Sequence, residues 1–211
     1  MRADAQRNAA RLRAAAADLF QERGLQVSLK EIARHAGVSH GTLYNLFGSR
    51  EALIDEVIAD LAATRLGDAA RTALACPDPW LGFAGYVTEV CELQATDPAL
   101  GDVLTRRFPD ASRLMAVCDN SFAAAESIID RARHDGSLRD DFTASDLLFF
   151  LASHAPLARA AATAGSDAWR RAVAFMLDGL RAPAATPLPV DPMTPAQINR
   201  LLVEGTSSTA G

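Results

Sequence analysis

A tight turn near the start of the chain constrains the fold more than any other feature. The turn Gly37-Val38-Ser39 separates two short segments whose apolar residues recur at three- and four-residue spacing, as they do in helices. Gly37 is free to take positive φ, and Ser39 is suited to cap the following helix. Two helices joined by such a turn form a helix-turn-helix unit.

Helices are also predicted on both sides of this unit. Apolar spacing followed by Gly24 predicts that a first helix ends near Arg23. Ser28 and Glu31 have the spacing of a capping box at the next helix start, and Ser49 can cap a long helix that links this N-terminal head to the rest of the chain. The predicted helices cover about 5–23, 29–36, 40–47 and 50–75.

The remainder of the chain has the same periodicity. Prolines preceded by aspartate, as at Asp78-Pro79 and Asp97-Pro98, are typical helix starts. Further helices are predicted over about 79–95, 98–107, 110–134, 144–164 and 169–180. No segment shows the alternation of apolar and polar residues that is typical of a strand. We therefore expect an all-α fold of about nine helices, with a three-helix head and a helical body.

Composition divides the chain into three parts. We expect a head over residues 1–50, a body over 51–182 and a flexible tail over 183–211, because the tail holds half of the ten prolines and few apolar residues. A short helix from Thr194 to Leu202 that docks on the body is the alternative for the tail. The head carries eight Lys and Arg against four Asp and Glu, although the whole chain has a net charge of −5. A basic head on an acidic body indicates a polyanionic partner.

Several classes of protein fit the sequence poorly. The chain has no nucleophile elbow, P-loop, dinucleotide fingerprint or HExxH pair, so we expect no enzyme and no cofactor. His154, Glu89 and Glu92 are better interpreted as core or solvated groups than as catalysts. Three widely spaced cysteines indicate neither disulfides nor a metal site, and therefore a reducing cytoplasm. No signal or membrane-spanning segment is expected.

The head resembles one known family closely over about residues 7–60. The resemblance rests on three segments, Ser28-Leu29-Lys30-Glu31-Ile32-Ala33, Ala36-Gly37-Val38-Ser39-His40-Gly41-Thr42-Leu43-Tyr44-Asn45-Leu46-Phe47 and Ser49-Arg50-Glu51-Ala52-Leu53. They are similar to the DNA-binding head of the bacterial tetracycline-repressor (TetR) family. The resemblance implies a cytoplasmic, homodimeric, sequence-specific transcription regulator, most often a repressor that a small molecule releases from a palindromic operator in double-stranded DNA.

The resemblance also implies roles for individual residues of the head. Leu43 and Phe47 anchor the recognition helix, and Leu46 stands where the family often has a histidine, so one phosphate donor is missing. The resemblance implies that base edges are contacted by His40, Gly41, Thr42 and Asn45. It implies that Lys30 contacts a base or a phosphate. The residues that contact phosphates are then Ser28, Ser39, Tyr44 and Arg50. An interaction module without DNA binding is the alternative, but it leaves the basic head unexplained.

Two candidate sites are expected in the body, where the family resemblance is weaker. A pocket for a small apolar or amphipathic effector is predicted from mainly apolar residues, the alternative being a filled core. Its candidate lining is Phe83, Tyr86, Val87, Val90, Cys91, Cys118, Phe122, Phe150 and His154. A dimer interface is predicted on the last two long helices, with intrachain packing as the alternative. Its candidates are Leu148, Leu151, Ala155, Ala158, Trp169, Val173, Met176 and Leu180.

Overall fold

The computed structural model describes residues 2–207, and no strand forms within this range. The helices are α1 (Arg2–Arg23), α2 (Leu29–His35), α3 (His40–Phe47), α4 (Arg50–Ala75), α5 (Pro79–Thr96), α6 (Pro98–Thr105), α7 (Ser112–His134), α8 (Ala144–Thr163), α9 (Ala168–Gly179) and α10 (Pro195–Ser207), with a 3-10 turn at Ala182–Ala184. Leu138 and Arg181 form one isolated antiparallel bridge. The prediction of an all-α fold is confirmed.

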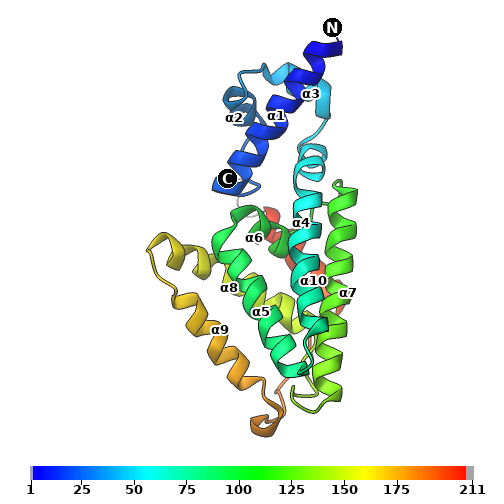
Figure 1. The fold of residues 1–211 in the computed structure, drawn as a ribbon, viewed down its shortest axis with the longest axis vertical. Helices are drawn as coiled ribbons and strands as arrows, with labels where there is room; N and C mark the ends of the chain where they lie inside the picture. Colours follow the sequence, from blue (N-terminus) through cyan, green and yellow to red (C-terminus); the bar gives the residue numbers. More distant parts are fainter. Residues whose placement is uncertain (1, 208–211) are drawn as a thin grey trace.

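The first three helices form the head at one end of the elongated molecule (Figure 1). Each of them contributes at least one completely buried side chain to the core of the head, such as Phe20 of α1, Ile32 of α2 and Leu43 of α3. Leu53 of α4 completes this core. Because α4 then continues into the body, the head is fixed to a long helix on its inner side.

Serine caps fix the boundaries of the short head helices. Ser28 Oγ accepts a hydrogen bond from Glu31 N at 3.2 Å, and Ser39 Oγ accepts one from Thr42 N at 3.1 Å. Only the serine half of the predicted capping box at Ser28 forms, because the Glu31 carboxylate pairs instead with Arg23 of α1. This ion pair ties α2 to α1, so the glutamate stabilises tertiary structure as well as its own helix.

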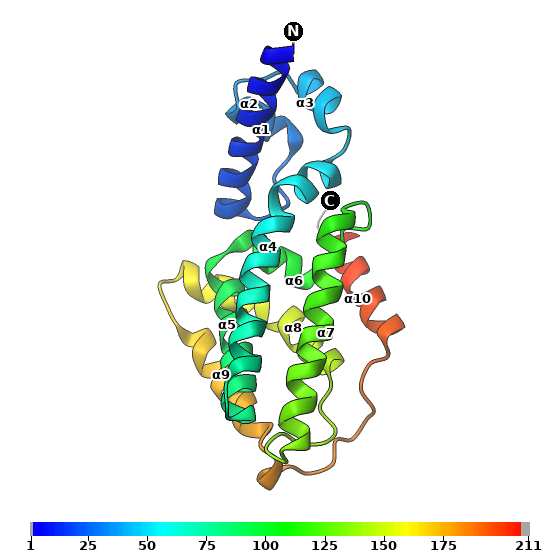
Figure 2. The same cartoon turned by 45° about the vertical axis from the view of Figure 1, so that its right-hand side comes forward.

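The body is built around α4, with α5 and α7 packed along it (Figure 2). α8 packs on α5 and α6, and α9 packs on α5 and α8. The α4–α5 contact is close: a Cβ at Gly82 would lie 2.5 Å from the carbonyl oxygen of Ala73. A larger residue at position 82 would therefore push the two helices apart.

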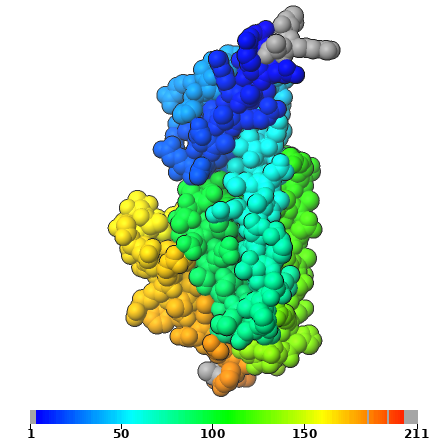
Figure 3. All heavy atoms as spheres, in the orientation of Figure 1, coloured from blue at the N-terminus to red at the C-terminus, as the bar shows by residue number. Residues whose placement is uncertain are grey.

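Head and body also meet directly, beside α4. The buried Asp102 of α6 accepts a hydrogen bond from Leu25 N, just after α1, at 2.7 Å. Gly24 makes this approach possible: its φ is +81°, and a Cβ there would lie 2.7 Å from Asp102 Oδ2. Figure 3 shows the head stacked on the body without a gap beside α4. The hydrophobic cluster of the head correspondingly extends into α6, where Leu100 is fully buried.

The C-terminal segment contains a helix within the predicted tail. Ile198 and Leu202 of α10 are buried, and α10 packs against α8. The docked helix, given above as the alternative, is thus the arrangement that the structure contains. The flexibility and the exact bounds of the tail stay predictions.

Candidate functional site

The recognition helix predicted from the sequence, α3, lies at the end of the molecule that is farthest from the body (Figure 1). Leu43 is fully buried and Phe47 is partly buried against the head core, as expected of anchors. Leu46 also packs against this core. An apolar residue is therefore compatible with the fold here, although it supplies no hydrogen-bond donor.

Most of the predicted DNA-contacting residues lie on the outside of the head. Those classed as exposed are Ser28, Lys30, Ser39, His40, Gly41, Tyr44 and Asn45. Ser28, Lys30 and His40 line one shallow groove between α2 and α3. Tyr44 is 55% exposed, and its ring centroid lies 6.1 Å from that of His40. An exposed aromatic pair beside a cationic groove is suited to contact a polar partner rather than to fill a core.

Two of the residues predicted to contact DNA, Thr42 and Arg50, are half-buried rather than exposed. Thr42 is half-buried, and its hydroxyl lies 2.8 Å from Ser39 Oγ. Arg50 is half-buried, and its Nη2 atom is shielded from water without a hydrogen-bond partner. Burial lowers the pKa of the Arg50 guanidinium, although the nearby carboxylates of Glu51 and Asp102 oppose this shift. Arg50 thus lies near the junction of head and body, apart from the exposed groove.

One exposed cation that lines the groove was not predicted as a site residue. Arg34 of α2 lines the same groove as Lys30, and its side chain is 78% exposed. It makes a 3.6 Å ion pair with Glu31, which is weak at such exposure. The signal in the sequence is its spacing, because residues four apart lie on one helix face.

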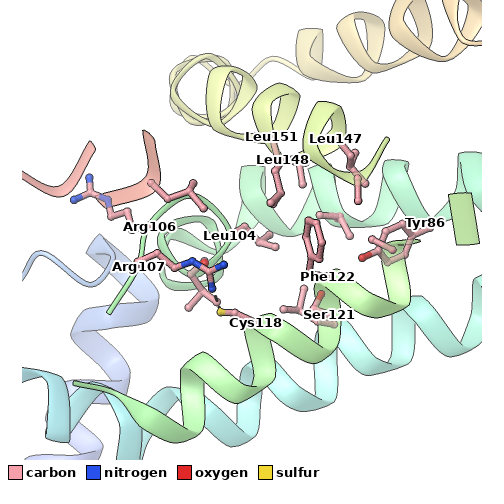
Figure 4. A pocket seen from close by; sticks show the side chains of 16 residues that line it. Tyr86, Leu104, Arg106, Arg107, Cys118, Ser121, Phe122, Leu147, Leu148 and Leu151 are labelled. Carbon is pink, nitrogen blue, oxygen red and sulfur yellow. Dashed lines mark hydrogen bonds between the residues drawn. The ribbon is translucent and has the colours of Figure 1, made fainter. Parts of the chain in front are cut away.

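The body contains a narrow, partly open cavity with a free interior volume of only about 50 Å³ (Figure 4). Four of the predicted lining residues do line it: Tyr86 and Val90 of α5, and Cys118 and Phe122 of α7. Three others, Phe83, Val87 and Cys91, are almost completely buried but are not among the residues that line this cavity.

The remaining two predicted lining residues, Phe150 and His154, lie elsewhere. Their rings stack at 5.2 Å between centroids, and the His154 ring meets Trp169 edge-on at 6.4 Å. Burial lowers the pKa of His154 because it disfavours the charged imidazolium. His154 is therefore packed among aromatic side chains.

Most of the cavity wall was not predicted. The additional lining residues are Leu66, Val103, Leu104, Arg106, Arg107, Ser121, Ala125, Ala144, Leu147, Leu148, Leu151 and Leu202. The pair Arg106-Arg107 directly after an apolar helix was a usable signal, since two adjacent cations are unusual beside buried positions. Leu202 of α10 was not predictable as lining, because only the tertiary fold brings the C-terminal helix here.

The cavity contains few polar atoms. Burial raises the pKa of Tyr86, whose hydroxyl also interacts with Ser121. Burial raises the pKa of the Cys118 thiol to about 11, and that of Cys91 outside the cavity to about 12. All three cysteines are free, and no cluster of potential metal ligands occurs within residues 2–207. The thiols of Cys91 and Cys118 are thus protonated and unreactive.

The predicted dimer residues mostly face the interior of their own chain. Leu151, Ala155, Ala158, Trp169, Val173 and Leu180 are buried, while Leu148 and Met176 are half-buried. Large apolar side chains on the opposite side of the same two helices are exposed: Phe149 by 50%, Leu157 by 72% and Phe175 by 63%. The intrachain alternative therefore describes the packing of the predicted set, and three other residues offer an apolar surface.

Comparison with protein families gives matches in both parts of the chain. Residues 12–57 match the family described as bacterial regulatory proteins of the tetR family. Residues 78–182 match the C-terminal domain described as that of SbtR-like transcriptional regulators. No curated protein sequence matches the chain significantly. Within residues 2–207, no helix has both the length and the apolar character needed to cross a bilayer.

The chain is also similar to solved structures of transcriptional regulators. A TetR transcription regulatory protein from Mycobacterium vanbaalenii is 31% identical, with 85% of this chain and 98% of that chain covered and a TM-score of 0.48. RolR in complex with resorcinol is 23% identical, with coverages of 90% and 99% and a TM-score of 0.53. FadR from Bacillus subtilis in complex with stearoyl-CoA is 14% identical, with coverages of 83% and 98% and a TM-score of 0.57. From the two family matches and the 31% identical relative, the chain belongs to the TetR family of bacterial transcriptional regulators.

Proposed function

We propose that this regulator is a repressor, that it binds a palindromic operator as a homodimer, and that a small molecule in the body cavity releases it. The observation that carries this proposal is the course of α4. This helix begins at Arg50 in the head, and Leu66, farther along it, lines the cavity. A helix of 26 residues is a stiff rod about 39 Å long, so a displacement at the cavity also moves the head.

Within the head, we assign different tasks to two groups of residues. His40, Gly41, Thr42 and Asn45 read base edges, and Lys30 reaches a base or a phosphate. Phosphates are contacted by Ser28, Ser39, Tyr44, Arg34 and Arg50, the last after its half-buried side chain has turned outward. The first group determines sequence preference, while the second supplies affinity that depends on salt.

The homodimer is proposed to form through the outer side of α8 and α9. Phe149 and Leu157 are eight residues apart on α8, so they lie on one side of this helix, and Phe175 extends the apolar surface onto α9. A second copy packed on this surface would complete a bundle of four helices. Two-fold symmetry then requires a palindromic operator with half-sites one or more DNA turns apart, each about 34–36 Å.

Effector release requires a ligand that binds one conformation of the dimer better than the other. Release of the operator by a factor of 100 corresponds to about 2.7 kcal/mol of differential binding, which lies within the usual range of coupling energies. RolR and FadR, which share this fold, were solved with resorcinol and with stearoyl-CoA. We infer that the cavity of this chain is likewise the effector site, and that head, body and tail divide at about residues 50 and 182.

A selection from random duplexes tests DNA recognition without knowledge of the operator. We expect enrichment of a palindrome that the protein retards in a gel and that is lost at high salt. Recovery of unrelated duplexes, or of none, would contradict the proposal.

Light scattering tests the dimer. The double variant Phe149→Glu and Leu157→Glu should yield monomers, because two carboxylates would be buried in the interface. The matched control is Leu81→Glu on α5, where the leucine is 60% exposed on a different surface. A monomeric wild-type protein at micromolar concentration, or a double variant that stays dimeric, would exclude this interface.

A further inference from the structure

The two ends of the cavity differ in chemistry. Arg106 and Arg107 follow the last turn of α6 at one end. Tyr86 and Ser121 supply the hydroxyl groups at the other end (Figure 4). The wall between them is apolar and includes Leu104, Phe122, Leu147, Leu148 and Leu151. A ligand that matches this cavity has an apolar body and one end that suits a guanidinium group.

Arg107 is the cation that points toward the cavity. Figure 4 shows its guanidinium beside Cys118, and its charge acts on the Cys118 thiol, the pKa of which it lowers against the larger effect of burial. Only 20% of the Arg107 side chain is exposed. Nearby Cys118 stays protonated because its pKa is about 11, so the thiol supplies no compensating negative charge.

The present partners of Arg107 are weak. Its Nη1 atom lies 3.4 Å from Asp119 Oδ1, and the Asp119 side chain is 72% exposed. Its Nη2 atom lies 3.5 Å from Asn199 Oδ1 of α10. Both distances exceed those of strong charge-assisted hydrogen bonds. A carboxylate inside the cavity would therefore be a better partner than either residue.

The neighbouring Arg106 is also incompletely neutralised. Its side chain is 14% exposed, its Nε atom lies 3.4 Å from Asp102 Oδ1, and its Nη1 atom is shielded from water without a hydrogen-bond partner. Asp102 is shared, because it also accepts from Leu25 N and pairs with Arg159 at 3.9 Å. Three arginines thus face one buried and one exposed carboxylate. These arginine side chains are only partly exposed, by 14% to 34%, and a partly buried excess of positive charge is stabilised when an anion compensates it.

We propose that the effector of this regulator is an amphipathic acid, with an apolar body that widens the narrow cavity and a carboxylate that binds Arg107. This inference rests on the proposed effector role of the cavity. A planar guanidinium binds a carboxylate through two parallel hydrogen bonds, which gives both affinity and orientation. A neutral molecule of the same shape fills the apolar part but leaves the positive charge uncompensated.

Calorimetric titration of the full chain, without DNA, tests the proposal. The probes are decanoate and 2-naphthoate, each compared with its neutral alcohol, decan-1-ol and 2-naphthalenemethanol. We expect at least one acid to bind at least tenfold more tightly than its alcohol. In the variant Arg107→Gln, affinity for this acid should fall about 10- to 100-fold, whereas affinity for the alcohol should change less than about twofold.

Two further variants keep the test specific. Arg107→Lys retains the charge but not the planar fork, so affinity for the acid should lie between those of the wild type and Arg107→Gln. The matched control is Arg113→Gln, because Arg113 is an exposed arginine of α7 that pairs with Asp60 and does not line the cavity. This control should bind both acids as the wild type does.

The outcomes separate this inference from the proposed function. Alcohols that bind as tightly as the acids, or acid binding that is unchanged in Arg107→Gln, would overturn the acid but leave the cavity as an effector site. If neither acid binds, the inference is also wrong. Because no DNA is present, a failure of operator binding would be seen only in the duplex selection and would not alter these titrations.

Discussion

In the head, most residues proposed to touch DNA lie on the outside of two short helices, whereas the body cavity is lined by side chains from α4, α5, α6, α7, α8 and α10 and from the segment after α6. The head surface depends mainly on local features, namely a serine cap before each short helix, a glycine turn between the two helices and a fully buried apolar anchor in each, Ile32 and Leu43. The cavity depends on packing between residues far apart in the sequence, such as Leu66 and Leu202. A local motif therefore presents the surface that is proposed to read DNA, while the long-range fold forms the site that is proposed to regulate it.

The largest effect is expected where the two regions meet. Asp102→Ala removes the acceptor of Leu25 N and leaves Arg106 and Arg159 with uncompensated charge, so the free energy of unfolding should fall by about 3–5 kcal/mol. Urea denaturation followed by tryptophan fluorescence, which reports on Trp80 and Trp169 in the body, and by circular dichroism measures this loss.

The same experiment shows whether head and body unfold together. Coincident curves in the wild type and separate curves in Asp102→Ala would mean that Asp102 couples the two regions. The control is Asp119→Ala, with a carboxylate that is 72% exposed, which should change stability by less than about 0.5 kcal/mol. Equal losses in the two variants would show that the junction contributes no special stability.

Within the head, substitutions of base-reading residues and of phosphate-contacting residues should have different effects on DNA binding. Thr42→Ala or Lys30→Ala should reduce discrimination between the selected palindrome and altered sites by about 1–3 kcal/mol. Arg34→Ala should weaken binding to all duplexes equally and reduce the salt slope by about one. Gel retardation at several salt concentrations measures both quantities. The same loss on every duplex for all three variants would refute the assigned roles.

A smaller effect is expected from the local cap of the recognition helix. Ser39→Ala removes the side chain that accepts from Thr42 N, which should lower the free energy of unfolding by about 1 kcal/mol. The control is Ser127→Ala in the middle of α7, where the hydroxyl only donates to the Ala123 carbonyl within the same helix. Thermal denaturation compares the two. A loss in the control as large as that at Ser39 would mean that capping does not explain the effect.

The smallest effect concerns pH. Burial lowers the pKa of His154 in the folded chain, so the unfolded chain takes up a proton first as the pH falls. Stability should therefore decrease below about pH 6.5, the ordinary pKa of histidine. Melting temperatures at pH 7.5 and 5.5 should differ less in His154→Phe than in the wild type. The control His134→Asn, on the exposed end of α7, should retain the full wild-type difference.

Several features of the head were predictable because their causes are close together in the sequence. The turn at Gly37, the caps at Ser28, Ser39 and Ser49, and the buried position of Leu43 each depend on residues within one or two helical turns. The family resemblance over the same region follows from this local pattern. Arg50 is the exception: its position near α6 depends on a contact between head and body, which spacing along one helix does not reveal.

In the body, the sequence determined the helices and their apolar faces, but not which helices those faces meet. Phe83 and Phe122 are both apolar residues on helices, yet only Phe122 lines the cavity. The apolar side of α8 and α9 that was predicted to face a partner is instead buried within its own chain. Hydrophobic periodicity predicts which face of a helix is buried, but it does not predict which other element packs on that face. The charge around Arg106 and Arg107 likewise became visible only when folding placed Asp102, Arg159 and α10 beside them, because electrostatic compensation depends on distance in space.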